Sequence, residues 1–165
     1  MLNRILINPL TFAADKAILQ GEVALQELDE RVCVPEMAET NRKIAYQITG
    51  GIDVLQRPFL DLSVSGDLKL HCQRCLLPTD FQLNENVRIV LFSDEETLDN
   101  AMVSDESLEG MLLDEELDML TLVEDQILMA LPISPKHNDC DDAHLDKVNQ
   151  GKPNPFAVLS GLKKG

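Results

Sequence analysis

The sequence predicts an α+β fold, with an antiparallel β-sheet, one well-defined helix near residues 118–131 and short helices near the N-terminus. Two runs in which apolar and polar residues alternate, at 60–72 and 81–91, predict neighbouring strands. In segment 114–132, apolar residues recur at helical spacing until a proline ends the pattern. The chain of 165 residues is long enough to bury one core, so we expect mainly one domain.

The N-terminal third gives weaker patterns. Residues 9–19 begin with a proline and a threonine at a plausible helix start, and they predict a short helix that runs into an extended piece near 18–25. Segment 24–34, "ALQELDERVCV", is compatible with a helix or a strand, and its pattern does not decide between them. Segment 43–50, "KIAYQITG", predicts a strand, and Gly51 after it predicts a turn.

The central part of the chain predicts a β-hairpin. The even-numbered apolar residues from Leu60 to Cys72 share one strand face, and segment 79–92 alternates in the same way. Gly66 lies on the apolar side and predicts a bend or bulge. The short connection "QRCLLPT" indicates antiparallel pairing, with Cys72 and Cys75 close to the turn.

The second half is predicted to contain an acidic loop at 93–118 and then the helix. Acidic residues crowd the helix start, where the helix dipole favours negative charge. We expect the helix to pack against the sheet through an apolar face formed by Leu120, Val123, Ile127 and Ala130 and widened by Met119, Leu122 and Met129. Residues 1–150 are predicted as the α+β domain and residues 151–165 as a basic tail.

The lack of a predicted membrane span and of a predicted secretory signal leads us to expect a cytoplasmic protein. No window approaches about 18 uninterrupted apolar residues, so we expect no membrane span. Asn8 and Pro9 interrupt the apolar N-terminus before it reaches the length of a signal peptide. Without a secretory signal, the four cysteines are expected to stay reduced, which favours metal ligands or free thiols over disulfides. Cys33 stands alone and is expected to be a buried small hydrophobe.

The strongest global signal is the net charge of −15. No lysine or arginine occurs between Ile89 and Pro135, where acidic residues are dense. This acidic segment is either a solvated surface or a binding surface for a basic partner such as a ribosomal protein. The residues predicted for such a surface are Asp94, Glu95, Glu96, Asp105, Glu106, Asp114, Glu115 and Glu116.

The same charge argues against a broad surface that follows phosphates, because nucleic-acid binding depends on lysine and arginine. Any direct contact with RNA would therefore be local. Segment 150–165 carries three lysines and no acidic residue. The candidate contacts with RNA or the ribosome are Arg74, Lys152, Lys163 and Lys164.

Two pairs of residues have the spacing of metal ligands. Cys72 and Cys75 form half of a zinc knuckle, and His137 and Cys140 repeat the same spacing further along the chain. Together they would form a tetrahedral structural zinc site, with His144 as an alternative ligand. Unliganded thiols and a redox pair remain open as other interpretations. The redox interpretation is the weakest, because a thioredoxin-type CxxC opens a helix, whereas this one joins two strands.

Sequence signatures of catalysis are missing. The chain contains no Walker loop, GxGxxG, HExxH or GxSxG motif. Many carboxylates in a loop do not make a paired general acid and base. We therefore expect a protein that is not an enzyme and has no small-molecule substrate.

Three blocks of sequence carry a family resemblance: "CQRCLLP", "LVEDQILMALPISPKHNDC" and "KPNPFAVLSGLKK". In order and spacing they resemble the bacterial YceD family, whose members are described as large ribosomal RNA subunit accumulation proteins. The resemblance implies a ribosome biogenesis factor that supports synthesis, processing or accumulation of large-subunit ribosomal RNA. The family's characteristic positions correspond to Cys72, Arg74, Cys75, Glu124, Asp125, Leu131, Pro132 and 153–156.

The resemblance also bears on cofactor and partner. Some relatives carry extra cysteines where this chain has His137 and Cys140, which strengthens the case for zinc, although this chain has only one cysteine in that region. The implied partner is a basic ribosomal protein or a large-subunit precursor, bound by the acidic segment. The alternative is a protein that binds RNA directly and locally through a structural zinc knuckle.

Overall fold

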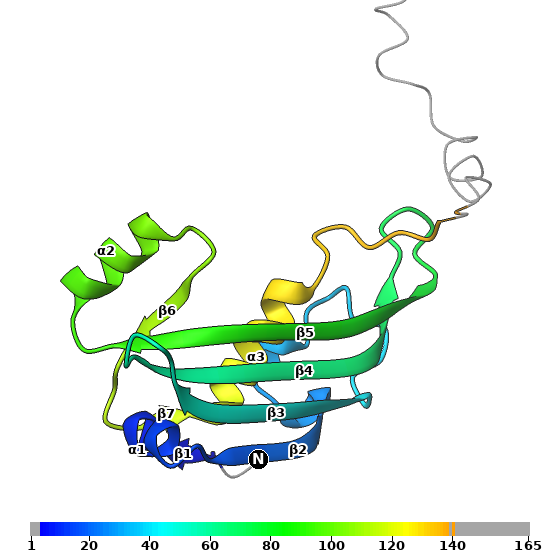
Figure 1. Cartoon of the computed structure of the whole chain (residues 1–165). Coiled ribbons are helices and arrows are strands. Elements are labelled where there is room, and N and C mark those ends of the chain that lie inside the picture. Colours follow the sequence, from blue (N-terminus) through cyan, green and yellow to red (C-terminus); the bar gives the residue numbers. More distant parts are fainter. Residues whose placement is uncertain (1–3, 139, 141–165) are drawn as a thin grey trace, which may run out of the picture.

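The computed structural model describes residues 4–138 and Cys140, and its central feature is a five-stranded sheet (Figure 1). The strand order is β2-β3-β4-β5-β6, and all neighbours are antiparallel except β6, which runs parallel to β5. The strands are β2 (Ile18–Ala24), β3 (Lys43–Ile52), β4 (Pro58–His71), β5 (Pro78–Phe92) and β6 (Glu109–Leu112). This arrangement confirms the predicted α+β fold.

Smaller elements surround this sheet. A second, two-stranded antiparallel sheet joins β1 (Leu6–Ile7) to β7 (Leu117–Asp118). The helices are α1 (Pro9–Ala14), α2 (Glu95–Ser104) and α3 (Met119–Ala130). The undecided segment 24–34 contains no α-helix, and only Ala24, the last residue of β2, belongs to a strand. The segment forms two short 3₁₀ helices, η1 (Leu25–Glu27) and η2 (Glu30–Val32). No helix in the described residues is long and apolar enough to cross a membrane.

The predicted hairpin is confirmed as β4 and β5, and its turn carries the two cysteines. Pairing runs without interruption from Phe59 with Val90 to His71 with Pro78. Of the bend or bulge predicted at Gly66, the bulge is therefore wrong. The glycine makes room instead for a side chain of β3, because a Cβ atom there would lie 2.7 Å from Cδ1 of Ile44.

Helix α3 covers one face of the sheet (Figure 1). Its residues Met119, Val123 and Ile127 are fully buried in the core, together with sheet residues such as Leu62. Amphipathic spacing explains the helix, and Asp118 caps it by accepting a hydrogen bond from the N–H of Leu120 at 3.1 Å. The prediction that Met129 widens the buried face is wrong, because Met129 is 72% exposed.

The prediction of an acidic loop at 93–118 is also wrong, because this segment contains α2 and β6. Asp94 caps α2 by accepting a hydrogen bond from the N–H of Thr97 at 2.8 Å, and two acidic residues in the first turn suit the helix dipole. The helix has no buried residue, but Leu98 lies against Gly110 of β6. The predicted tail at 151–165 lies outside the described residues.

Candidate metal centre and charged surfaces

The turn between β4 and β5 directs the two cysteine sulfurs to one side. It closes through a hydrogen bond from the N–H of Leu76 to the carbonyl oxygen of Cys72 at 2.8 Å, with Leu76 at a positive φ of 62°. The N–H of Arg74 points back at Sγ of Cys72, 3.4 Å away. Backbone N–H groups aimed at a sulfur stabilise its thiolate form, which is the form that binds metals.

The chain returns to this turn after α3 ends. The segment that follows Pro132 reaches the hairpin, where the N–H of Gln73 donates to the carbonyl oxygen of Pro135 at 2.8 Å. Further along, Nε2 of His137 donates to the carbonyl oxygen of Pro78 at 3.0 Å. These two bonds hold the second predicted ligand pair beside the first.

The structure brings all four predicted ligands together. The ligand atoms of Cys72, Cys75, His137 and Cys140 lie within 4.8 Å of one another. Sγ of Cys72 is 3.7 Å from Sγ of Cys140, and Sγ of Cys75 is 3.3 Å from Nδ1 of His137. Cys72 is buried and the other three residues are half-buried. Among the described residues, Cys33 and His71 are outside this group, and the alternative ligand His144 lies outside the description.

The four residues fit a tetrahedral zinc ion. Zinc–sulfur and zinc–nitrogen bonds of about 2.3 and 2.0 Å place neighbouring ligand atoms about 3.5–3.8 Å apart. The contacts between Cys72 and Cys140 and between Cys75 and His137 are close to this spacing. No two ligand atoms are more than 4.8 Å apart, so binding zinc would move ligand atoms inward by about 1 Å at most. Three thiols and one imidazole are also the ligand types that structural zinc prefers.

The sulfurs of this group differ in their acidity. Burial raises the pKa of Cys72, but hydrogen bonds from the backbone N–H groups of Cys75, His137 and Arg74 outweigh burial and lower that pKa to about 5. Burial and the neighbouring sulfurs of Cys75 and Cys72 raise the pKa of Cys140 to about 12. At neutral pH one sulfur is therefore already a thiolate, and another must lose its proton before it can bind a metal.

The imidazole of His137 is held in the orientation that a ligand needs. The Nε2–H group donates to the carbonyl of Pro78, so the lone pair of the neutral ring lies on Nδ1, which faces Cys75. A backbone carbonyl in this role commonly fixes the tautomer of a histidine that binds a metal. The hydrogen bond to Pro78 is also the largest cause that raises the pKa of His137.

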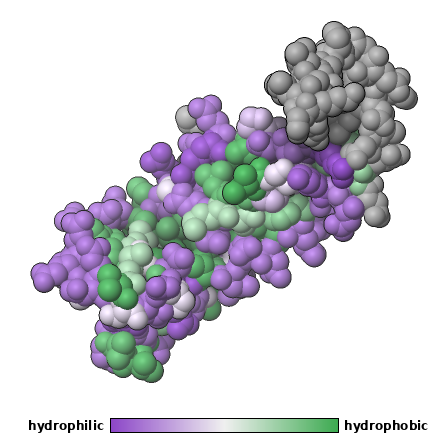
Figure 2. Space-filling view, turned by 90° about the horizontal axis from the view of Figure 1, so that it is seen from above, coloured by the Kyte–Doolittle hydropathy of each residue, from purple (hydrophilic) through white to green (hydrophobic). Residues whose placement is uncertain are grey.

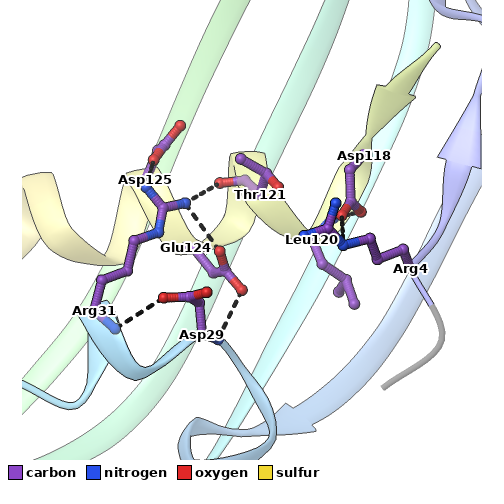
Figure 3. Close-up of polar contacts among 8 residues, drawn as sticks. All are labelled: Arg4, Asp29, Arg31, Asp118, Leu120, Thr121, Glu124 and Asp125. Carbon is purple, nitrogen blue, oxygen red and sulfur yellow. Dashed lines mark hydrogen bonds and ion pairs between the residues drawn. The ribbon is translucent and has the colours of Figure 1, made fainter. Parts of the chain in front are cut away.

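A second polar group joins α3 to η2 (Figure 3). Glu124 is buried, and its carboxylate accepts the N–H of Asp29 at 3.0 Å and Nη2 of Arg31 at 2.9 Å. Nη1 of Arg31 donates to Asp125 at 2.7 Å. Glu124 and Asp125 therefore hold η2 against α3. Arg31 was not predicted from the sequence, although a carboxylate inside an apolar helix indicates that a partner is needed.

The predicted acidic surface lies in the half of the molecule away from the cysteine turn (Figure 1). All eight of its acidic residues are exposed, at the start of α2, just after α2 and between β6 and β7. Two of them have local roles: Asp94 caps α2, and Asp105 accepts the N–H of Ser107 at 3.0 Å. Within the described part of the chain, none of the eight forms an ion pair.

The predicted basic contacts are only partly visible. Arg74 is exposed in the cysteine turn, so it lies next to the candidate metal centre. Lys152, Lys163 and Lys164 lie outside the described residues.

A family model described as "Large ribosomal RNA subunit accumulation protein YceD" matches residues 60–163. The chain belongs to the YceD family. The match includes the cysteine hairpin, the acidic segment, α3 and all four candidate metal ligands. Membership confirms the resemblance that the three sequence blocks predicted.

One YceD relative, the large ribosomal RNA subunit accumulation protein YceD of Haemophilus influenzae, is 33% identical over 109 residues. The match covers 59% of this chain and 61% of that relative, so it spans about three fifths of the relative's length. No solved structure matches.

Proposed function

We propose that this chain is a cytoplasmic, non-enzymatic ribosome biogenesis factor that supports synthesis, processing or accumulation of large-subunit ribosomal RNA. It acts by binding a basic ribosomal protein or a pre-ribosomal particle. The observation that carries the proposal is the acidic surface of eight exposed carboxylates, none of which forms an ion pair with a lysine or arginine of the described residues. Family membership supports the link to the large subunit.

The charge of this surface suits a protein that handles basic cargo. Its carboxylates are exposed and form no ion pair within the described residues, so a cationic partner gains Coulomb attraction without first breaking such pairs. A surface of this sign repels the phosphates of RNA. Contact with ribosomal RNA through the acidic half of the molecule would therefore pass through a protein.

The polar contacts of the described residues also favour a binding role. Apart from the group of cysteines and His137, the ion pairs among the described residues form between a carboxylate and an arginine or lysine. The ion pair of Arg31 with Glu124, which joins η2 to α3, is an example. Such pairs stabilise a fold and supply no nucleophile. The contact between Cys75 and His137 belongs to a set of four metal ligands, and we assign it to metal binding.

Zinc in the Cys72, Cys75, His137 and Cys140 group is the second part of the proposal. A bound zinc ion would fasten the segment after α3 to the hairpin turn. It would neutralise the thiolates that bind it, in a group where Cys72 is buried and the other three ligands are half-buried. The expected role is structural, because four protein ligands leave no open coordination position for a substrate.

The metal proposal is tested by elemental analysis of the full chain purified without added metal. We expect about one zinc per chain, as four protein ligands define a single tetrahedral site. Cys75→Ser should lose the zinc, whereas Cys33→Ser is the matched control and should keep it. Metal-free protein with a disulfide between Cys72 and Cys75 would contradict the proposal and favour the redox interpretation.

The partner proposal is tested by pull-down of the tagged chain at physiological salt. We expect a basic ribosomal protein or a large-subunit precursor to be recovered. Reversal of the three charges at Asp114, Glu115 and Glu116 should reduce recovery, whereas reversal of Glu22 on the far edge of the sheet should not. A pull-down that recovers no basic ribosomal component would contradict the proposal.

Direct RNA binding is the second candidate, and the exposed position of Arg74 in the turn between the cysteine ligands favours it. Zinc knuckles are among the modules that bind single-stranded RNA. Under this alternative, changing Lys163 and Lys164 to glutamate should abolish RNA crosslinking while circular dichroism shows an intact fold. Crosslinking that is unchanged in this variant and in Arg74→Glu would exclude these residues as the RNA contacts.

A further inference from the structure

Strand β5 has an open edge at residues 79–88. On one side β4 pairs along its length, whereas on the other side β6 pairs only from Ile89 to Phe92. At its beginning, the carbonyl of Pro78 accepts a hydrogen bond from His137. Within residues 4–138, no backbone–backbone hydrogen bond joins the outer side of 79–88 to another segment. In Figure 1, β5 forms the border of the sheet between α2 and the hairpin turn.

Such an edge is a template for strand addition. In an antiparallel pair, every second residue directs its N–H and C=O groups away from the partner. An extended peptide that reaches the edge can pair with those groups, and its alternate side chains then extend both faces of the sheet. Natural proteins normally protect a long open edge against pairing with other strands, for example with a charged side chain that points toward the core side. The residue that protects β5 therefore indicates which strands the edge excludes.

The residue that protects the edge is Glu85, which points toward the apolar side of the sheet. It shares its strand face with Phe81, Leu83 and Val87, and it pairs across from the buried Val64. Glu85 is half-buried, and no hydrogen bond or ion pair of its carboxylate is found within the described residues. Figure 2, which views the molecule from above β5, shows hydrophobic surface between hydrophilic margins.

The other charges on the same stretch are already neutralised. Asp80 forms an ion pair with Lys69, and Arg88 donates to both carboxylate oxygens of Asp61 at 2.7 Å. Glu85 is therefore the one uncompensated charge on strand residues 79–88 within the described part of the chain. Its sign determines which peptide the edge can accept.

An apolar strand added to this edge would bury the carboxylate of Glu85 without a partner, which costs free energy. A strand with a lysine or arginine opposite Glu85 would form a cross-strand ion pair instead. Apolar residues two positions to either side would extend the hydrophobic face formed by Leu83 and Val87. The edge thus discriminates by charge at one position and by hydrophobicity at its neighbours.

We propose that the open edge of β5 at residues 79–88 binds an extended basic segment of a partner protein as an added strand, with a lysine or arginine of the partner opposite Glu85. This inference rests on the proposed function, because it specifies how a basic partner is bound. It assigns the partner an extended conformation and a binding site separate from the acidic surface.

The test is amide hydrogen exchange, followed by NMR, on the full chain with the synthetic peptide Thr-Val-Thr-Lys-Thr-Val-Thr. Its lysine and two valines share one face, as the edge requires. We expect slower exchange at alternate amides of residues 79–88, and no such change with the peptide that has glutamate in place of lysine. Glu85→Lys should weaken binding of the lysine peptide by about tenfold. Glu22→Lys, the same charge change on the other edge strand, should leave binding unchanged.

Three results would overturn the inference. One is binding of the lysine peptide that Glu85→Lys does not weaken. Another is alternate amides of 79–88 that already exchange slowly in the free chain, because the edge would then be covered by this chain's own tail or by a second copy. The third is peptide-dependent change confined to residues 94–116, which would refute strand addition and still support the acidic surface as a site for basic partners.

Discussion

The ion pair of Arg31 with Glu124 gives the sharpest prediction about stability. Arg31→Ala removes a guanidinium that donates to Glu124 at 2.9 Å and to Asp125 at 2.7 Å. The side chain of Glu124 is only 11% exposed, so after the change its buried carboxylate keeps a single donor, the N–H of Asp29. The change should therefore destabilise the contact between η2 and α3.

The magnitude follows from the burial of the two carboxylates. A hydrogen bond to a charged group contributes about 1.5–3 kcal/mol. The guanidinium is 40% exposed, so solvent screening places the Glu124 contribution in the lower part of this range. Asp125 is 50% exposed and adds at most about 0.5 kcal/mol. We expect Arg31→Ala to lower the free energy of unfolding by about 1.5–2.5 kcal/mol.

Denaturant unfolding of Arg31→Ala, Glu124→Gln and the double variant measures this effect. The double-mutant cycle should give a coupling of about 1–2 kcal/mol between the two side chains. Arg42→Ala is the matched control, since Arg42 is 38% exposed but its partner Glu39 is 43% exposed. Arg42→Ala should therefore cost less. An equal cost for the two arginine variants would refute the reasoning, because burial of the carboxylate would then have no effect.

Three further predictions concern the metal centre, the packing of α1 and the cap of α2. Zinc affinity, measured by competition with a chelator, should rise about tenfold per pH unit for each proton displaced between pH 6 and 8. Cys72, with a pKa of about 5, is already a thiolate in this range, but Cys140, with a pKa of about 12, must lose its proton. A pH-independent affinity would contradict this assignment. Gly50→Ala would place a Cβ atom 2.8 Å from Cα of Ala13 in α1, so it should lower the free energy of unfolding by about 1–3 kcal/mol in a denaturant titration. An unchanged stability would show that α1 can move freely. Asp94→Ala should speed amide exchange in α2. The hydrogen bonds from the threonine three residues later lower the pKa of Asp94, so the cap stabilises the helix above the unfolded pKa of about 3.9 and is lost as pH falls through the lower folded pKa. Protection factors in α2, corrected for the intrinsic pH dependence of amide exchange, that change with neither pH nor the substitution would refute the cap.

The hairpin and α3 could be predicted because their signals are local. Leu60 and Leu62 alternate with polar residues at the strand period, and Val123 and Ile127 recur at the helix period. Each pattern indicates which side of its own segment faces the core. The CxxC pair was then placed correctly in the turn, because the two alternating runs bound it closely on both sides.

The sequence predictions were wrong where the local composition indicates one structure and the tertiary contacts stabilise another. The acidic residues of segment 93–118 indicated a loop, yet the cap at Asp94 and the contact of Leu98 with Gly110 suffice for a helix that buries none of its residues. Met129 has an apolar side chain at a suitable spacing, yet it lies on the exposed side near the end of α3. Composition cannot reveal which side of a helix end the sheet leaves uncovered.

By itself, the sequence determined the strand alternation, the cysteine turn, the amphipathic helix and the concentration of negative charge, since each depends on residues close together in the chain. Tertiary structure alone decided that His137 and Cys140 reach Cys72 and Cys75, and that Glu124 meets Arg31. These contacts join residues 62 or more positions apart. They exist because α3 packs across the sheet and the chain then returns to the hairpin, and no local spacing encodes that path.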